Sequence, residues 1–355
     1  MKILVDLGHP AHIHYFKNFI WLMKEKGHEF CIISRDKEVL QQLLNHYKFE
    51  FISRGKGGNG LLGKAIYLFK ADYIIYKAAK KFKPDLFFSF SSTYAAHVSR
   101  IFKKPHIVLD DTEHAKFELL MYPPFSDVIL NPKPFWKLFS KKQLFFDSYM
   151  EISHLNPKYF TPNPEILSTY GLSKDEKYFI VRFVSWNASH DVGQEGLDFS
   201  TKINIVSKLS RSGRALISSE GKLPPELEDY RIKINPAHLH QLLYYASLYI
   251  GEGATTAAEA IILGTPAIYI NSLDAGTISE QASKYGLISM RNSSGIFEKI
   301  DIALSEKSAS NAKEMQKKIL KDKIDITAFL VWFVDTYPNS ENALRINSDY
   351  QYNFK

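Results

Sequence analysis

A turn of small residues stands between two apolar segments in the second half of the chain. The strand-like run "SLYI" leads into "GEGATT" (251–256), and the helix-forming "AAEAIILG" follows. Small side chains let a phosphate approach the backbone closely, and the unpaired N–H groups of a helix start favour an anion. Threonine hydroxyls at such a start can cap the helix and also donate to phosphate. The pattern predicts a diphosphate-binding corner formed by Gly253, Ala254, Thr255 and Thr256.

Two carboxylates mark the same stretch. Glu259 lies three residues after Thr256, which is the spacing of a helix-capping box. The alternative is that Glu259 accepts hydrogen bonds from both hydroxyls of a ribose. Glu252 is unfavourable beside a phosphate, so we expect it to point away or to contact sugar hydroxyls. The turn is neither a Walker loop nor a GxGxxG motif at the chain start.

A second group of candidates follows the first apolar strand, "KILVDL". Gly8 allows a tight turn, and the next helix should offer unpaired backbone N–H groups to a diphosphate. His9, His12 and His14 follow within six positions and are candidates for a catalytic base, here His9 or His12, or for a phosphate contact. Helix capping and packing would explain them too. A metal site is a third alternative, but the i, i+3, i+5 spacing differs from the i, i+4 pair of a helical site.

Charged and hydroxyl side chains also follow two later strands. The segment "VLDDTEHAKFE" places Asp110 and Asp111 directly after a strand. A carboxylate in a cleft can take the proton of a sugar hydroxyl, and Asp111 is the candidate for that role. Capping or ion pairing would explain these acids as well. The serines and Thr93 of "FSFSSTYAAHVSR" (88–100) are either helix caps or the lining of a ligand site.

The polar loop "RFVSWNASHDVG" follows the first strand of the second half. A tryptophan in a strand-exit loop suits stacking against a ligand. The surrounding polar groups are expected to bind the nucleotide diphosphate, and a cation there would stabilise the departing diphosphate. The candidates are Arg182, Ser185 and His190.

These loops need a scaffold that brings strand ends together. Strand and helix patterns alternate along both halves, which predicts an α/β fold with two doubly wound parallel sheets. One of the helices should bury Phe16, Phe19, Ile20 and Met23 and end at Gly27. In such sheets ligands bind beyond the carboxyl ends of the strands. The expected order is a domain at 1–150, a proline-rich linker at 151–176 and a second domain at 177–325, which includes a strand at 230–234. A helix at 326–340, which could pack back across both domains, and a loose tail at 341–355 follow.

Composition narrows the class of protein. The chain has 355 residues, a net charge of +7 and one cysteine, Cys31, so no disulfide can form within it. We expect no signal peptide and no membrane span, and a cytoplasmic location. The positive charge suits an anionic ligand or a membrane surface better than nucleic acid, because no nucleic-acid-binding signature is present. The basic and aromatic "KPFWKLFSKKQLFF" (133–146) could face the inner membrane surface, or could be an ordinary solvated helix with a core stripe.

The segments "GHPAHIHYFKNFIWLMKEKGHEF" and "GEGATTAAEAIILGTPAIYI" resemble the GT-B superfamily, in particular MurG-like GlcNAc transferases and non-hydrolysing UDP-GlcNAc 2-epimerases. "GHPAHIHYF", "NPKYFTPNPEIL" and "VRFVSWNASHDVG" look more like a bacterial and archaeal family of GT-B-like proteins with no assigned function. The resemblance implies a GT-B fold whose two Rossmann-like domains face a cleft. It places Gly8 and His9 at that cleft, a nucleotide on Gly253, Ala254 and Thr256, ribose on Glu259, and His190 in a loop of the epimerase type. The Gly-Gly-Ser-x-Gly loop of MurG and the Arg-Arg-Glu-Asn loop of the epimerases are absent.

These features together predict a metal-independent glycosyltransferase that uses a nucleotide-diphosphate sugar such as a UDP-sugar, in surface polysaccharide or glycolipid synthesis. No cofactor and no metal are expected, because no Asp-x-Asp motif precedes a strand. The acceptor would be a sugar or a lipid-linked sugar. The alternatives are a sugar-nucleotide epimerase or hydrolase on the same scaffold, and a non-catalytic nucleotide-sugar-binding or assembly protein.

Overall fold

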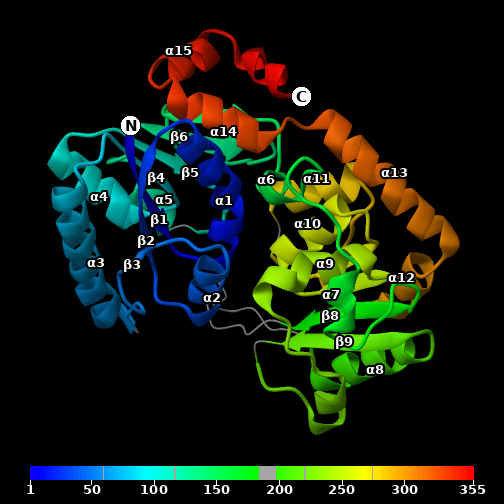
Figure 1. Ribbon diagram of the computed structural model, residues 1–355. Coiled ribbons are helices and arrows are strands. Elements are labelled where there is room, and N and C mark those ends of the chain that lie inside the picture. Colours follow the sequence, from blue (N-terminus) through cyan, green and yellow to red (C-terminus); the bar gives the residue numbers. More distant parts are fainter. Residues whose placement is uncertain (59, 116, 184–196, 220, 274) are drawn as a thin grey trace. The chain divides into compact units, whose positions relative to one another are not determined.

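The computed structural model describes residues 1–355 except 59, 116, 184–196, 220 and 274 (Figure 1). The chain divides into two compact units. The first consists of Met1–His154 and Lys323–Lys355, and the second of Leu155–Asp322. Two short helices, α6 (Ile152–Leu155) and α7 (Glu165–Ser168), lie in the segment expected as a linker. Among the described residues, no helix has both the length and the apolar character needed to cross a bilayer.

A seven-stranded parallel sheet forms the centre of the first unit. Its strands are β1 (Lys2–Leu7), β2 (Glu29–Ser34), β3 (Ile52–Ser53), β4 (Leu86–Phe90), β5 (His106–Leu109), β6 (Val128–Pro132) and β7 (Gln143–Phe146). Their order in the sheet is β3-β2-β1-β4-β5-β6-β7, and Val5 pairs with Ile32 on one side and Phe88 on the other. The direction of winding reverses between β1 and β4. This is the switch point at which sheets of this kind bind ligands.

Helices cover both faces of this sheet, with α3 and α4 on one side and α1 on the other (Figure 1). The helix α1 buries Phe16, Phe19, Ile20 and Met23, which confirms the predicted pattern. It ends before Gly27, whose φ of +85° is accessible to glycine at little cost. The helices of this unit are α1 (Pro10–Glu25), α2 (Glu38–His46), α3 (Gly60–Phe82), α4 (Thr93–Phe102), α5 (Glu118–Met121), α14 (Ile326–Asp335), α15 (Asn339–Ile346) and the 3-10 helix η3 (Ser348–Phe354).

The C-terminal residues are held against the end of β7, and Asp147 is the centre of that contact. Its carboxylate accepts hydrogen bonds from Lys323 Nζ at 2.9 Å and from the Tyr352 hydroxyl at 2.8 Å. Its backbone N–H donates to Gln351 Oε1 at 2.6 Å, and Gln351 is fully buried. The expectation of a loose tail is therefore wrong, because these hydrogen bonds and the burial of Gln351 hold the tail in place.

The basic and aromatic segment before β7 also differs from the expected helix. Residues 133–142 form turns and extended chain with no helix. Phe135 and Phe139 pack with Tyr122 in a buried cluster, whereas Trp136 is 51% exposed and Leu138 is 82% exposed. The apolar side chains alternate between core and solvent, so the interpretation as a solvated helix is wrong.

The second unit has a five-stranded parallel sheet in the order β12-β11-β10-β8-β9. Its strands are β8 (Tyr178–Phe183), β9 (Arg214–Ser219), β10 (Leu248–Gly251), β11 (Ala267–Ile270) and β12 (Ile288–Met290). The winding reverses between β8 and β10, so the switch point lies at the ends of those two strands. The helices are α8 (Phe199–Ser210), α9 (Leu239–Tyr245), α10 (Ala254–Ile262), α11 (Gly276–Lys284), α12 (Ile296–Ala303) and α13 (Glu306–Asp322), with 3-10 helices η1 (Pro225–Tyr230) and η2 (Pro236–His238).

The strand expected at 230–234 is absent from this sheet. Only Arg231 forms an isolated bridge, to Ile217 of the edge strand β9. The isoleucines at 232 and 234 are only half-buried, and η2 begins two residues later. An apolar alternation without a covering layer is not sufficient to extend the sheet.

Candidate functional site

The β1–α1 turn of the first unit places Gly8, His9 and His12 at the switch point, but its backbone donors are already used. His9 caps α1, and its Nδ1 accepts a hydrogen bond from the Ala11 N–H at 3.2 Å. His12 Nδ1 accepts from the Gly8 N–H at 3.2 Å, and the His12 N–H donates to the His9 carbonyl at 3.0 Å. Pro10 has no N–H to offer. The expectation of unpaired N–H groups at this helix start is therefore wrong.

These hydrogen bonds also fix what the two histidines can do. A neutral imidazole whose Nδ1 accepts a hydrogen bond carries its proton on Nε2, so it presents a donor. Burial, followed by the nearby charges of His9, Lys37 and Arg54, holds the pKa of His12 well below its usual value. His12 is therefore a neutral hydrogen-bond donor in this geometry, and a base would have to come from elsewhere.

Asp111, the third candidate for the base, lies at the exit of β5. Burial and then the charge of Asp110 raise the pKa of Asp111 to about 7. Burial raises the pKa of Asp110 to about 6, and the Tyr122 hydroxyl donates to Asp110 Oδ2 at 2.5 Å. Thr112 Oγ1 donates to Asp111 Oδ1 at 3.1 Å, and Asp111 is half-buried. A carboxyl that titrates near neutral pH is suited to take a proton from a hydroxyl.

The exit of β4 lies between those of β1 and β5 in the sheet. Ser92 caps α4 by accepting from the Ala95 N–H at 3.1 Å, which agrees with the capping interpretation. Its hydroxyl also donates to Asp6 Oδ2 at 2.5 Å. Ser91 adopts a left-handed φ of +47°, which is costly for a residue other than glycine. Ser89 is buried and bonds His106 Nε2 at 2.8 Å, so it does not line a site.

Sequence reasoning missed a buried ion pair at this edge. Asp6 on β1 is fully buried, and its Oδ1 accepts from Arg54 Nε at 2.8 Å. Arg54 follows β3 and is only 3% exposed. A signal was present, because an aspartate inside an otherwise apolar strand needs a buried cationic partner. The sequence did not say which of the many lysines and arginines that partner is.

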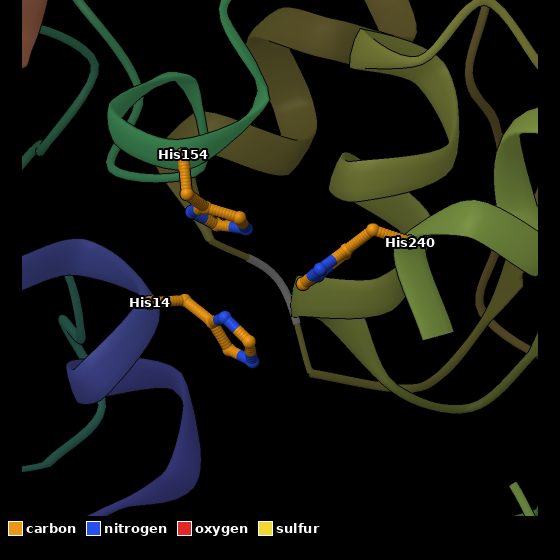
Figure 2. A group of neighbouring side chains, drawn as sticks. All are labelled: His14, His154 and His240. Carbon is orange, nitrogen blue, oxygen red and sulfur yellow. The ribbon is translucent and has the colours of Figure 1, made fainter. Parts of the chain in front are cut away.

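The third histidine of the first turn, His14, lies apart from His9 and His12. It is buried on α1, and its ring centroid lies 5.1 Å from that of His154 on α6, also in the first unit (Figure 2). The rings of His9 and His12 are 5.8 Å apart. His9 and His12 therefore form a pair in the β1–α1 turn, whereas His14 packs against His154. This arrangement does not support a metal site formed by His9, His12 and His14.

In the second unit, the turn after β10 has the geometry that its small residues predict. A Cβ at Gly251 would lie 2.3 Å from Tyr249 Oη and 2.8 Å from the Arg182 carbonyl, so only glycine fits. The helix α10 begins at Ala254, with Gly253 as its N-cap and no side-chain cap. Gly253, Ala254 and Thr255 are half-exposed, whereas Thr256 is buried. The first-turn N–H groups thus remain without a capping side chain at the switch point.

Glu259 is buried on α10 and paired with a histidine. Its Oε1 lies 2.9 Å from His240 Nε2, and Glu259 is 4% exposed. His240, on α9, is labelled in Figure 2. The capping-box interpretation is wrong, because the helix begins at Ala254 and Thr256 is already its third residue.

The Glu252 carboxylate contacts the chain before α8. This agrees with the expectation that Glu252 points away from the diphosphate-binding corner. Glu252 is buried, and its Oε1 accepts from the Leu197 N–H at 2.7 Å. Asn271 Nδ2 donates to the Glu252 carbonyl at 2.9 Å. The carboxylate is therefore engaged with the backbone that precedes α8.

Arg182 lies at the end of β8, where Nη1 donates to Ser218 Oγ at 3.2 Å. Ser218 belongs to the neighbouring strand β9, so the guanidinium lies at the same sheet edge as the start of α10. Ser185 and His190 lie in 184–196, outside the described residues.

Comparison with known proteins matches residues 1–335 to a family described as "Protein of unknown function (DUF354)". An uncharacterised protein of Methanocaldococcus jannaschii is 25% identical over 281 residues, which cover 76% of this chain and 81% of that protein.

Solved structures similar to this one include two kinds of enzyme. The S. aureus MnaA structure with UDP has a TM-score of 0.67 at 10% identity and covers 96% of this chain and 97% of its own. The UDP-GlcNAc 2-epimerase of M. jannaschii has a TM-score of 0.63 at 15% identity, over 89% and 99%. A spinosyn rhamnosyltransferase complexed with thymidine diphosphate has a TM-score of 0.62 at 14% identity, over 95% and 100%. These similarities confirm the GT-B fold that the motifs predict.

Proposed function

We propose a function for this chain, which belongs to the DUF354 family: it is a metal-independent glycosyltransferase that uses a nucleotide-diphosphate sugar. The observation that carries the proposal is the uncapped start of α10 at the switch point of the second sheet. Backbone N–H groups and the helix dipole at such a position favour a diphosphate. Structural neighbours with the same fold were solved with UDP and with thymidine diphosphate, which supports a ligand of this class.

The donor would be held by the second unit. The N–H groups of Ala254, Thr255 and Thr256 bind the diphosphate, and Arg182 stabilises the charge that develops as it leaves. Glu259, oriented by His240 at 2.9 Å, accepts hydrogen bonds from the ribose. Ser185 and His190 remain proposed contacts of the same diphosphate.

The acceptor chemistry would come from the first unit. Asp111 takes the proton of the acceptor hydroxyl, whose oxygen forms a bond to the anomeric carbon of the donor sugar. The bond from that carbon to the diphosphate oxygen breaks, and the nucleotide diphosphate leaves with the electron pair. His9 and His12, whose Nδ1 atoms are occupied, would donate hydrogen bonds and would not act as the base.

A sugar-nucleotide epimerase or hydrolase is the second candidate. Asp110 and Asp111 are adjacent carboxyl groups with raised pKa values, and such a pair can serve as acid and base toward one sugar. The UDP-GlcNAc 2-epimerase of M. jannaschii, at a TM-score of 0.63, is as similar to this structure as the rhamnosyltransferase, at 0.62.

Incubation with UDP-, GDP- and TDP-sugars distinguishes the candidates, with and without simple sugar and lipid-linked acceptors. A transferase releases nucleotide diphosphate only when an acceptor is present, and EDTA leaves its rate unchanged. Conversion of the sugar with no acceptor would establish the epimerase or hydrolase. If no nucleotide diphosphate raised the thermal midpoint, the remaining possibility would be a protein that binds something else.

We extend the proposal to a peripheral membrane contact through Trp136 and Leu138, which project from a lysine-rich segment. Co-sedimentation with phosphatidylglycerol vesicles should fall when both are changed to serine. The matched control is Ile346→Ser, because Ile346 is 88% exposed on α15 of the same unit. Equal binding by all three proteins would refute the contact.

A further inference from the structure

Arg54 is held rigidly at the carboxyl-end edge of the first sheet. Its Nε donates to Asp6 Oδ1 at 2.8 Å, and its Nη1 donates to the Tyr67 hydroxyl at 2.5 Å. Its Cζ lies 4.6 Å from the ring centroid of Tyr94. The side chain is 4% exposed, so its conformation is fixed by the protein.

One nitrogen of the Arg54 guanidinium, Nη2, takes no part in these contacts. Within the described residues, Nη2 makes no hydrogen bond. A Cβ on Gly8 would lie 3.4 Å from Nη2 and 3.8 Å from His12 Cε1. Because Gly8 has no side chain, Nη2 faces the β1–α1 turn, which is half-exposed and lies at the switch point.

Other basic side chains act on the groups around Nη2: Lys37 on His12, and Arg35 on Tyr67. Arg35 and Lys37 follow β2, and the Nζ of Lys70 would lie 3.8 Å from a Cβ on Gly55. His12 adds a neutral donor and no repelling charge. A guanidinium whose position is already fixed binds an oxyanion without losing side-chain entropy.

We propose that Arg54 Nη2, at the Gly8 turn, binds an oxyanion group carried by the acceptor, either a phosphate or a carboxylate. This inference rests on the proposed transferase function, which assigns the donor diphosphate to α10 in the second unit. The start of α1 cannot hold the anion in the same way, because its N–H groups are consumed by His9 and His12.

Hydrogen–deuterium exchange on the full chain tests the site with inorganic phosphate as the probe and sodium chloride at equal ionic strength as the blank. Phosphate should slow exchange in peptides that cover residues 8–16 and 54–58. A parallel titration with acetate distinguishes a carboxylate ligand from a phosphate ligand. UDP should slow exchange at 251–262, and this readout reports the proposed donor site separately.

The matched variants are Gly8→Ala and Gly221→Ala. The first places a methyl group against Nη2 and keeps the Arg54–Asp6 pair, whereas a Cβ at Gly221 meets no atom within 4 Å. Loss of one charge-assisted hydrogen bond should raise the half-saturating phosphate concentration about tenfold in Gly8→Ala only. Arg54→Lys, which can retain the ion pair but lacks Nη2, should behave like Gly8→Ala if it unfolds at a similar urea concentration.

Two results would overturn the inference. One is unchanged phosphate protection at 8–16 in Gly8→Ala and Arg54→Lys. The other is protection by phosphate and acetate at 251–262 alone. If UDP failed to protect 251–262 while phosphate protected 8–16 in a Gly8-dependent manner, the donor assignment would fail and the anion site would stand.

Discussion

The start of α10 offers a substitution that removes a donor while leaving the helix in place. Ala254 is the first helical residue, and its N–H has no partner inside the helix. Proline is tolerated at this position, because its fixed φ of about −65° suits the first turn. Gly253 has a φ of −94° and a ψ of 117°, an extended conformation that accepts a following proline. Ala254→Pro should therefore delete one N–H and little else.

The expected effect on binding follows from the hydrogen bond that is lost. A hydrogen bond to a charged group contributes about 1.5–3 kcal/mol, so the Kd for UDP should rise about tenfold to a hundredfold. The free energy of unfolding should change by no more than about 0.5 kcal/mol, since no core contact or intrahelical bond is removed.

Isothermal titration calorimetry with UDP at fixed salt measures the first quantity, and urea unfolding measures the second. Phe199→Pro is the control, because Phe199 is the first residue of α8 and is 62% exposed. It should leave the Kd for UDP unchanged. If Ala254→Pro were to bind UDP as tightly as the wild type with its fold intact, the diphosphate would not lie on this helix start.

Four further results are expected. Transfer activity should rise with pH through about 7, because Asp111 loses its proton there. Asp111→Asn should reduce kcat by about a hundredfold or more. A flat pH profile of the wild type would contradict the role of Asp111 as the base. Because the pKa of Asp111 is raised in the folded protein, the free energy of unfolding should fall as pH rises from about 4 to about 7. In urea unfolding, Asp111→Asn should therefore be more stable than the wild type at pH 8 and not at pH 4. Gly251→Ala should lower the free energy of unfolding by about 1–3 kcal/mol, because its methyl group would overlap Tyr249 Oη; a change as small as that of Gly221→Ala would disprove the close contact. Wild-type protein should bind UDP more tightly than 2′-deoxy-UDP, and Glu259→Ala should lose that preference; equal preference in both proteins would remove Glu259 from the ribose.

The alternation of strands and helices was predictable, because each long segment carries its own periodic pattern. The helix with Phe16, Phe19, Ile20 and Met23 is an example in which the buried face appears directly in the sequence. The prediction failed where burial depends on the neighbouring chain. Residues 230–234 have a strand-like pattern but no covering layer.

The candidate site was predictable where a local rule applied. Position 251 requires glycine because a side chain there would overlap the hydroxyl of Tyr249, which is only two residues away in the sequence. The pairs Asp6–Arg54 and Glu259–His240 join residues 48 and 19 positions apart, and no local rule chooses such partners. Glu252 was recognised as misplaced beside a phosphate, but its partner, the Leu197 N–H, is a backbone group that leaves no trace in the sequence.

The contacts of Asp147 with Lys323, Gln351 and Tyr352 affect the order in which the two units can fold during synthesis on the ribosome. The second unit is one continuous segment, and all of its residues are available once Asp322 has emerged. The first unit has to wait for Lys323, Gln351 and Tyr352, which are made after the whole second unit. Domains generally fold as units during synthesis, with earlier segments folding first. In this chain the synthesis of the first unit starts before that of the second unit and ends after it. Asp147 therefore lacks Gln351 and Tyr352 while the second unit is being made, and a chain truncated near residue 345 would leave the first unit, and not the second, incomplete.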